Sequence, residues 1–201
     1  MDDCVEIKGT RYALNLSYDN VLRVLELFRD KDFSKEQRLE IAFDMLVIGA
    51  DELEIDLYAK DQIVSFILQD FLEIGFNPKK GPKYYDFTED APYIYASFLQ
   101  DYNIDLIDQQ GKLHWKKFIA LLSSLSEETK FSQVVGIRQM KIPPLDKHNA
   151  EQRASIIKAK QFYRLRGEED PHIVADRVDN AFNQVASMIR AGGVKNWQME
   201  E

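Results

Sequence analysis

Aromatic and aliphatic side chains recur at helical spacing through residues 86–140, and this repeat most limits the folds open to the chain. In its first part, intervals of four, three and four residues separate Ala91, Tyr95, Phe98 and Tyr102. A second run begins at Trp115, and a third follows it. Because such spacing places side chains on one helical face, we predict three helices in a compact antiparallel unit. We expect five aromatic residues to anchor its core: Tyr95, Phe98, Trp115, Phe118 and Phe131.

Local signals set the expected ends of these helices. The first should begin near Thr88 and break at Asn103. The second is predicted over residues 112–124. Ser126 is expected to cap the third, because its hydroxyl can accept a hydrogen bond from a free amide of the first turn. Gly136 is well placed to end or weaken that helix.

The N-terminal half predicts a hairpin followed by three helices. Val5 and Ile7 alternate with polar residues before Gly9, and this pattern is typical of a strand and its turn. The helices are expected over residues 19–29, 34–48 and 59–74, with an acidic loop over 51–56. The second opens with a capping box from Ser34 to Gln37. The expected core faces are Val21, Leu25 and Phe28, then Leu39, Phe43 and Leu46, then Ile63, Phe66, Ile67, Phe71 and Ile74.

Two adjacent prolines, Pro143 and Pro144, mark the expected domain boundary, because proline interrupts helices. We therefore predict a helical core domain over residues 1–142, with the hairpin at its start, and an extension of two helices over 143–201. The fold class is mainly α: a compact multi-helix domain with a small N-terminal β-hairpin and a C-terminal helical extension.

The first helix of the extension, expected over residues 149–166, is basic. Its basic face is predicted to hold Arg153, Lys158, Lys160 and Arg164. Three interpretations stay open: a solvated helix face, a surface for an acidic protein partner, and a surface for nucleic acid.

The last helix carries a regular apolar stripe, which either packs back on the core or meets another chain. That other chain would be a second copy or a helical partner. The stripe and its flanking residues are our candidate partner-binding surface: Val174, Val178, Ala181, Phe182, Val185, Met188 and Ile189.

Composition narrows the class of protein. The net charge of −8 argues against nucleic acid as the main partner, since phosphate binding needs clustered Lys and Arg. A single cysteine, Cys4, excludes a disulfide within one chain and fits a reducing compartment. No apolar run has the length of a membrane span, and the acidic N-terminus has no hydrophobic signal core.

No residue pattern predicts an enzyme, a metal site or a cofactor. The three histidines, His114, His148 and His172, fall in different elements without the paired spacing that zinc needs. Cys4 has no nearby base to activate it. The acidic segment 51–56 lacks the pattern of a calcium loop, and no phosphate-binding glycine loop or nucleophile elbow is present.

The central stretch resembles a family of small tailed-phage proteins named after gene product fifteen, and the resemblance covers roughly residues 4–166. The opening of the chain also looks like that of the family, from Val5-Glu6-Ile7 to Leu14 and then Ser34 to Leu39. The central residues that carry it are Tyr85-Asp86-Phe87, Asp90, Tyr93-Ile94-Tyr95-Ala96, Phe98-Leu99, Tyr102, Ile104-Asp105-Leu106, Leu113-His114-Trp115, Phe118, Leu121-Leu122, Leu125-Ser126, Thr129-Lys130-Phe131, Gly136 and Arg138.

This resemblance implies a role in tail morphogenesis, without a catalytic motif. Such proteins look like tail assembly chaperones, which keep the long helical tape-measure protein soluble in the host cytoplasm until tail-tube subunits replace them. The expected partner is therefore the tape-measure protein or another tail protein, with a homo-oligomer as a further possibility. Two alternatives remain: a structural component of the virion tail or head–tail region, and a DNA-binding accessory protein.

Overall fold

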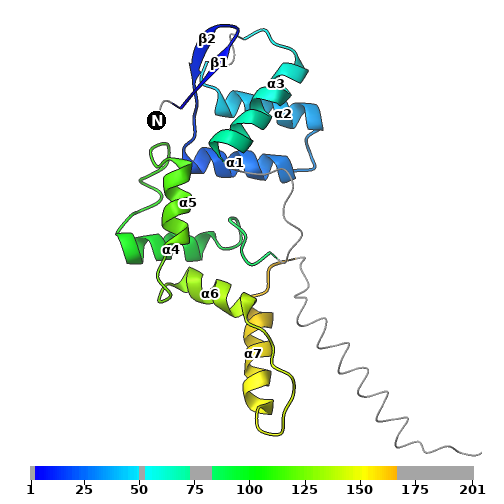
Figure 1. Cartoon of the computed structure of the whole chain (residues 1–201), viewed down its shortest axis with the longest axis vertical. Helices are drawn as coiled ribbons and strands as arrows, with labels where there is room; N and C mark the ends of the chain where they lie inside the picture. Colours follow the sequence, from blue (N-terminus) through cyan, green and yellow to red (C-terminus); the bar gives the residue numbers. More distant parts are fainter. Residues whose placement is uncertain (1–2, 50–52, 73–82, 167–201) are drawn as a thin grey trace, which may run out of the picture. The chain divides into compact units, whose positions relative to one another are not determined.

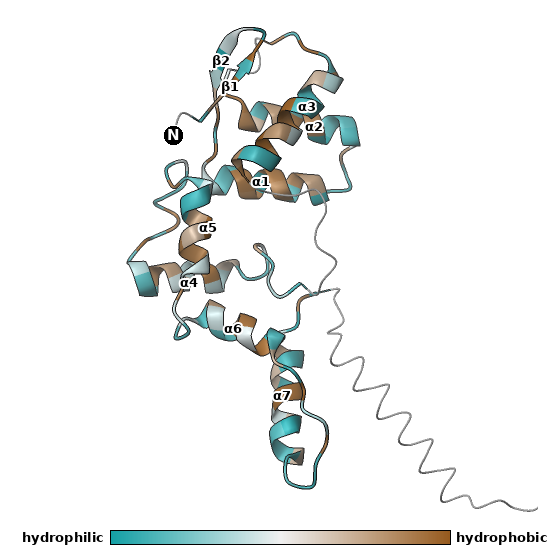
Figure 2. Cartoon of the chain, in the orientation of Figure 1, coloured by the Kyte–Doolittle hydropathy of each residue, from teal (hydrophilic) through white to brown (hydrophobic). Residues whose placement is uncertain are grey.

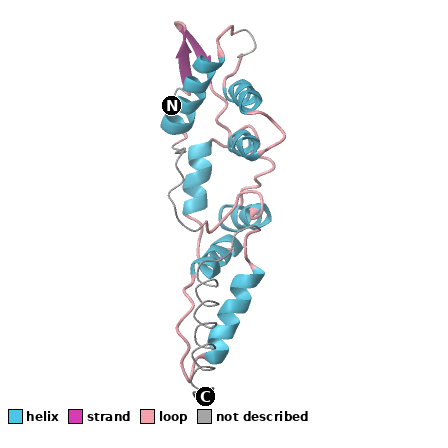
Figure 3. Ribbon diagram, turned by 90° about the vertical axis from the view of Figure 1, so that its right-hand side faces the viewer, coloured by secondary structure: helices cyan, strands magenta, loops and turns pink. Residues whose placement is uncertain are grey.

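The computed structural model describes residues 3–49, 53–72 and 83–166. These residues are mainly helical with one small antiparallel hairpin, so the predicted fold class is confirmed (Figures 1 and 3). The chain divides into two compact units, and each is described by itself. The first takes in the described residues of Met1–Gly81 together with Asp90–Phe131, and the second those of Pro82–Glu89 with Ser132–Glu201.

The hairpin forms where the sequence predicts it. Strands β1 (Cys4–Ile7) and β2 (Thr10–Ala13) pair antiparallel, with Val5 opposite Tyr12. The two turn residues between them have positive φ values, 51° and 78°, which suit a two-residue hairpin turn. Val5 and Ile7 are buried, so the alternation of the first strand reflects its packing.

Three helices follow in the first unit: α1 (Tyr18–Arg29), α2 (Lys35–Leu46) and α3 (Leu57–Phe66). Apolar residues lie along all three (Figure 2). The capping box of α2 is present, with Ser34 Oγ accepting a hydrogen bond from the Gln37 amide at 3.2 Å. On α1 the buried apolar residues are Tyr18, Val21 and Val24, whereas the predicted Leu25 is only half-buried.

Helix α2 ends two residues earlier than predicted. Val47 is extended and forms an isolated β-bridge with Leu14, and the Ile48 amide donates to the Ala13 carbonyl at 2.9 Å. The Val47 amide still bonds to the Phe43 carbonyl of α2 at 2.9 Å, whereas the Ile48 amide is bonded to the hairpin strand and not to the helix. This is a long-range contact, which helical spacing does not encode.

The second half of the helix predicted over residues 59–74 does not keep α-helical geometry in the residues that the structure describes, and Ile74 lies outside them. After α3 the chain makes a π-helical turn, η2 (Ile67–Phe71). A π turn fits an extra residue into each turn and so shifts the side chains around the helix. Ile67, a predicted core residue, and its neighbour Leu68 are buried, whereas Phe66, the last residue of α3, is 47% exposed instead of lying in the core.

Helices α4 (Ala91–Tyr102) and α5 (Trp115–Ser123) complete the first unit. In α4 the buried residues are Ile94, Ser97 and Phe98. Ala91 is exposed, so the predicted face is displaced by part of a turn. Asn103 ends α4 in the left-handed conformation, with φ 53°, at the predicted break.

The predicted aromatic anchors fill this core with one exception. Phe118 lies between Tyr18 and Phe98, with ring centroids 4.9 and 5.3 Å away. The Trp115 ring is buried, and its Nε1 donates to the Leu72 carbonyl at 3.2 Å. Tyr95 is only half-buried.

In the second unit, α7 (Ala150–Phe162) follows α6 (Lys130–Gln139), whose first two residues belong to the first unit. Ser126 does not cap α6. Its amide and hydroxyl both donate to the Asp101 carboxylate, and the helix begins four residues later at Lys130. Gly136 lies inside α6 and does not end it.

Candidate functional site

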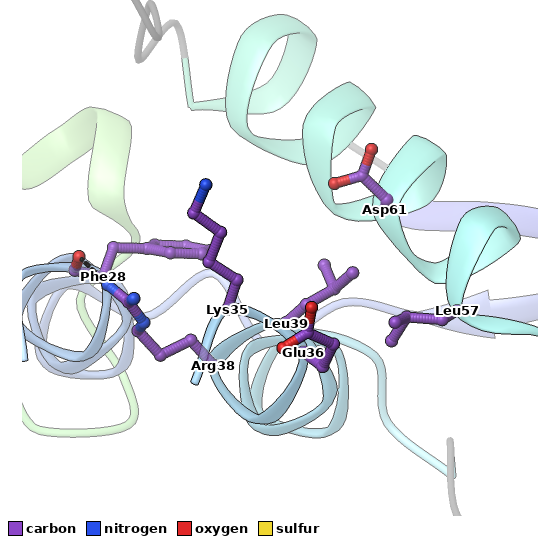
Figure 4. A pocket seen from close by; sticks show the side chains of 7 residues that line it. All are labelled: Phe28, Lys35, Glu36, Arg38, Leu39, Leu57 and Asp61. Carbon is purple, nitrogen blue, oxygen red and sulfur yellow. Dashed lines mark hydrogen bonds between the residues drawn. The ribbon is translucent and has the colours of Figure 1, made fainter. Parts of the chain in front are cut away.

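A groove crosses α1, α2 and α3 in the first unit (Figure 4). It has a volume of about 270 Å3 and takes its lining from the end of α1, the first half of α2 and the start of α3. The lining residues are Phe28, Lys35, Glu36, Arg38, Leu39, Leu57 and Asp61.

The floor of the groove is apolar and comes from three different helices. Leu39 of α2 lies between Phe28 of α1 and Leu57 of α3 (Figure 4). All three side chains are half-buried, so each packs on the core and still presents apolar surface to the groove. A floor of this kind can take up apolar side chains of a partner.

Two of the four charged lining residues are already bound within the protein. Arg38 Nη1 donates to the Phe28 carbonyl at 3.0 Å, which ties α2 to the end of α1. The Glu36 carboxylate accepts a hydrogen bond from Ser34 Oγ at 2.8 Å. A hydrogen bond from the Glu36 amide, together with the one from Ser34, lowers the pKa of Glu36.

The other two charged residues of the lining, Lys35 and Asp61, make no hydrogen bond or ion pair with their side chains among the described residues. Both residues are exposed, and they stand on different helices of the groove (Figure 4). The groove thus offers one free cation and one free anion beside an apolar floor.

The sequence predicted the two residues Phe28 and Leu39 as core positions but missed the groove. The helix expected from residue 59 left out Leu57, although α3 begins there. The missed signal is Asp56, whose carboxylate accepts a hydrogen bond from the Ala59 amide at 2.8 Å and caps α3.

The four residues of the predicted basic face have different environments on and after α7. Lys158 and Arg164 are exposed. Arg153 is half-buried, and its Nε donates to the Pro143 carbonyl at 3.1 Å. Lys160 is only 1% exposed. These four side chains therefore do not form one solvent-exposed basic face.

Buried cations hold the second unit together. Lys160 Nζ donates to the carbonyls of Arg138 and Met140, at 2.5 and 2.8 Å, where α6 ends. Arg138 Nε donates to the Tyr163 carbonyl at 2.6 Å, and its Nη1 to the Tyr84 carbonyl at 3.0 Å. These hydrogen bonds link the end of α6 to α7, to the residue after it and to the segment that holds Tyr84.

The Asp86 carboxylate of the same unit is also held by hydrogen bonds within the protein. Burial would raise the pKa of Asp86, but hydrogen bonds from Lys83 and from the Glu89 and Thr88 amides hold that pKa well below its usual range. Asp86 is thus ionised and bonded in place, which makes it a structural group.

The candidate partner-binding residues of the last helix, from Val174 to Ile189, lie outside the described residues, as does His172. Within the described ranges, no group of three or more His, Cys, Asp or Glu side chains is placed to hold a metal ion. His114 caps α5, accepting a hydrogen bond at Nδ1 from the Lys116 amide at 3.1 Å. No helix in the described part of the chain is long and apolar enough to cross a membrane.

Comparison with known proteins gives one match. The family model described as Bacteriophage Gp15 protein matches residues 1–165. Neither the curated proteins nor the solved structures include a match to this chain.

Proposed function

The chain belongs to the Bacteriophage Gp15 protein family, and we propose that this bacteriophage protein acts as a tail assembly chaperone. In this proposal it binds the long helical tape-measure protein in the host cytoplasm during tail morphogenesis. It works by binding and carries out no catalytic step. Family membership over residues 1–165 is the observation that carries the proposal.

The groove supports a binding role. A tape-measure protein exposes long apolar helical stripes before the tail tube covers them. A protein that holds such a client needs accessible apolar surface set beside charges that keep the complex soluble. The floor residues Phe28, Leu39 and Leu57, with Lys35 and Asp61 beside them, have this character. The predicted apolar stripe from Val174 to Ile189 is a second candidate surface for a client or for another copy of the chain.

Co-expression tests the proposal directly. The tape-measure protein of the same phage is produced alone, with the full-length chain, and with an unrelated acidic helical protein of similar size. We expect only the full-length chain to raise the soluble fraction of the tape-measure protein and to co-purify with it. If solubility does not change and no complex forms, the chaperone proposal is wrong.

The composition of purified phage particles gives an independent test. A chaperone leaves before the tail is complete, so mass spectrometry of purified virions should detect the tail-tube and tape-measure proteins without this chain. Stoichiometric amounts in the virion would instead identify it as a structural component of the particle.

A further inference from the structure

We propose that the apolar stripe predicted from Val174 to Ile189 packs antiparallel along α7 of the same chain and covers Phe162. The stripe itself lies outside the described residues, whereas α7 is the last described helix (Figure 1). This contact lies within one chain and does not depend on the proposed function. A client protein reaches the stripe only by displacing it from α7.

The described part of the second unit has little apolar core. Its buried residues are Asp86, Val134, Arg138, Lys160 and Leu165, so only two of the five are apolar. A unit held together by packing needs more buried apolar surface than two aliphatic side chains supply. Further apolar residues are therefore required to complete it.

Most of α7 is not buried by the described residues. Of its thirteen residues only Lys160 is buried. Phe162, the last residue of the helix, is 78% exposed, and its ring meets the Tyr163 ring edge-on with centroids 4.8 Å apart. An isolated helix of this length is marginal in water, because most helical stability in proteins comes from packing. Helix α7 therefore leaves an aromatic side chain for another element to cover.

The connection along the chain brings the stripe to this surface. Seven residues, 167–173, join Arg166 to Val174, and they span at most about 28 Å. Helix α7 has thirteen residues and is about 20 Å long, so the stripe begins within reach of Phe162. Short connections make successive helices antiparallel neighbours. A tether of this length also gives an effective concentration on the order of millimolar, which favours the chain's own stripe over that of a second copy.

The charges of the two segments are complementary. Residues 150–166 hold five basic residues and one acidic residue, whereas residues 167–191 hold five acidic residues and two basic ones. Lys158 and Arg164 are exposed, so they stand where they can meet acidic side chains at the rim of the contact. Rim charges of this kind orient two surfaces more than they add affinity.

A photo-crosslinking benzoylphenylalanine in place of Phe162 in the full-length chain identifies what covers this side chain. A denaturing gel separates chains linked to themselves from linked pairs of chains, and mass spectrometry maps the crosslinked residues. We expect crosslinks within one chain, to residues 174–189. The matched control carries the same crosslinker at Tyr58, an aromatic residue of the first unit that is 74% exposed, and should give none to those residues.

Two outcomes of the crosslinking overturn the proposal. Linked pairs of chains joined through residues 174–189 would show that a second copy supplies the stripe. Crosslinks from position 162 that never reach residues 174–189 would show that the stripe does not cover Phe162.

Charges placed on the stripe give an independent test. Val178→Asp and Val185→Asp change residues of the stripe, whereas Asn180→Asp and Asn183→Asp add the same charge on other faces of the predicted helix. We expect the amides of α7 to exchange roughly tenfold faster in the two stripe variants than in the controls, because α7 loses its cover. Unchanged exchange of the α5 amides shows that each variant is folded. Equal exchange of α7 in the stripe variants and the controls contradicts the proposal.

Discussion

Replacing Lys160 with methionine should destabilise the second unit by about 2–4 kcal/mol. The Lys160 ammonium is almost wholly buried and donates short hydrogen bonds to the carbonyls of Arg138 and Met140, with a longer one to Ile137 at 3.3 Å. A hydrogen bond from a charged donor is worth about 1.5–3 kcal/mol, so losing the two short ones costs about 3–6 kcal/mol. Removing the buried charge offsets part of this loss in the free energy of unfolding, because the ammonium no longer has to be desolvated.

The control is Lys158→Met on the same helix. Lys158 is exposed, and methionine has nearly the helix propensity of lysine, so this change should stay within about 0.5 kcal/mol of the wild type. Hydrogen exchange of the α6 and α7 amides is the suitable measurement, because it reports the opening of one part of a chain with two units. Thermal unfolding followed by circular dichroism gives the global effect.

The decisive comparison is between the two variants. If amides of α6 and α7 exchange equally fast in Lys160→Met and Lys158→Met, the buried ammonium does not stabilise the end of α6. A faster exchange confined to Lys160→Met, across both helices, agrees with the hydrogen bonds seen in the structure.

Three further changes test other parts of the fold. Trp115→Ala should lower the free energy of unfolding by about 3–5 kcal/mol, because it empties a buried ring site and removes the donor to Leu72; an unchanged denaturation midpoint would show that the ring is not core. Asp86 has a lowered pKa in the folded state, so its bonds stabilise the protein above about pH 4 and are lost as pH falls below that value. Asp86→Asn should therefore lower stability at neutral pH and flatten the acid side of the stability–pH curve, and equal slopes for the two proteins would contradict this. Gly9→Ala places a side chain at φ 78°, so it should cost about 1–2 kcal/mol by chemical denaturation, whereas alanine at the exposed Lys31 should have almost no effect.

Several signals that act over a few residues were read correctly from the sequence, although the cap expected at Ser126 did not form and the cap at Asp56 was missed. The hairpin turn before Thr10, the capping box at Ser34 and the helix break at Asn103 all lie where they were predicted. Each depends on hydrogen bonds or backbone angles within about four residues, so the neighbouring sequence is sufficient to specify it.

The candidate site was less predictable. The groove needs Phe28, Leu39 and Leu57 to come together from three helices, and their separation along the chain hides this. The basic helix predicted over 149–166 was identified by counting charges, which does not separate the buried Lys160 from the exposed Lys158. That difference arises because the end of α6 presents carbonyls to one side of α7.

The sequence by itself determined the mainly helical class, the N-terminal hairpin and the aromatic residues Phe98, Trp115 and Phe118 of the core, because periodicity and apolar burial are properties of the chain alone. Tertiary structure decided which side of each helix is covered, as the exposed Phe66 at the end of α3 shows. It also decided which charged side chains of the described residues are buried and hydrogen-bonded, as Lys160 is, and which are exposed, as Lys158 is. The physical reason is that a side chain's environment is set by the surfaces packed against it, and these come from residues distant in the chain.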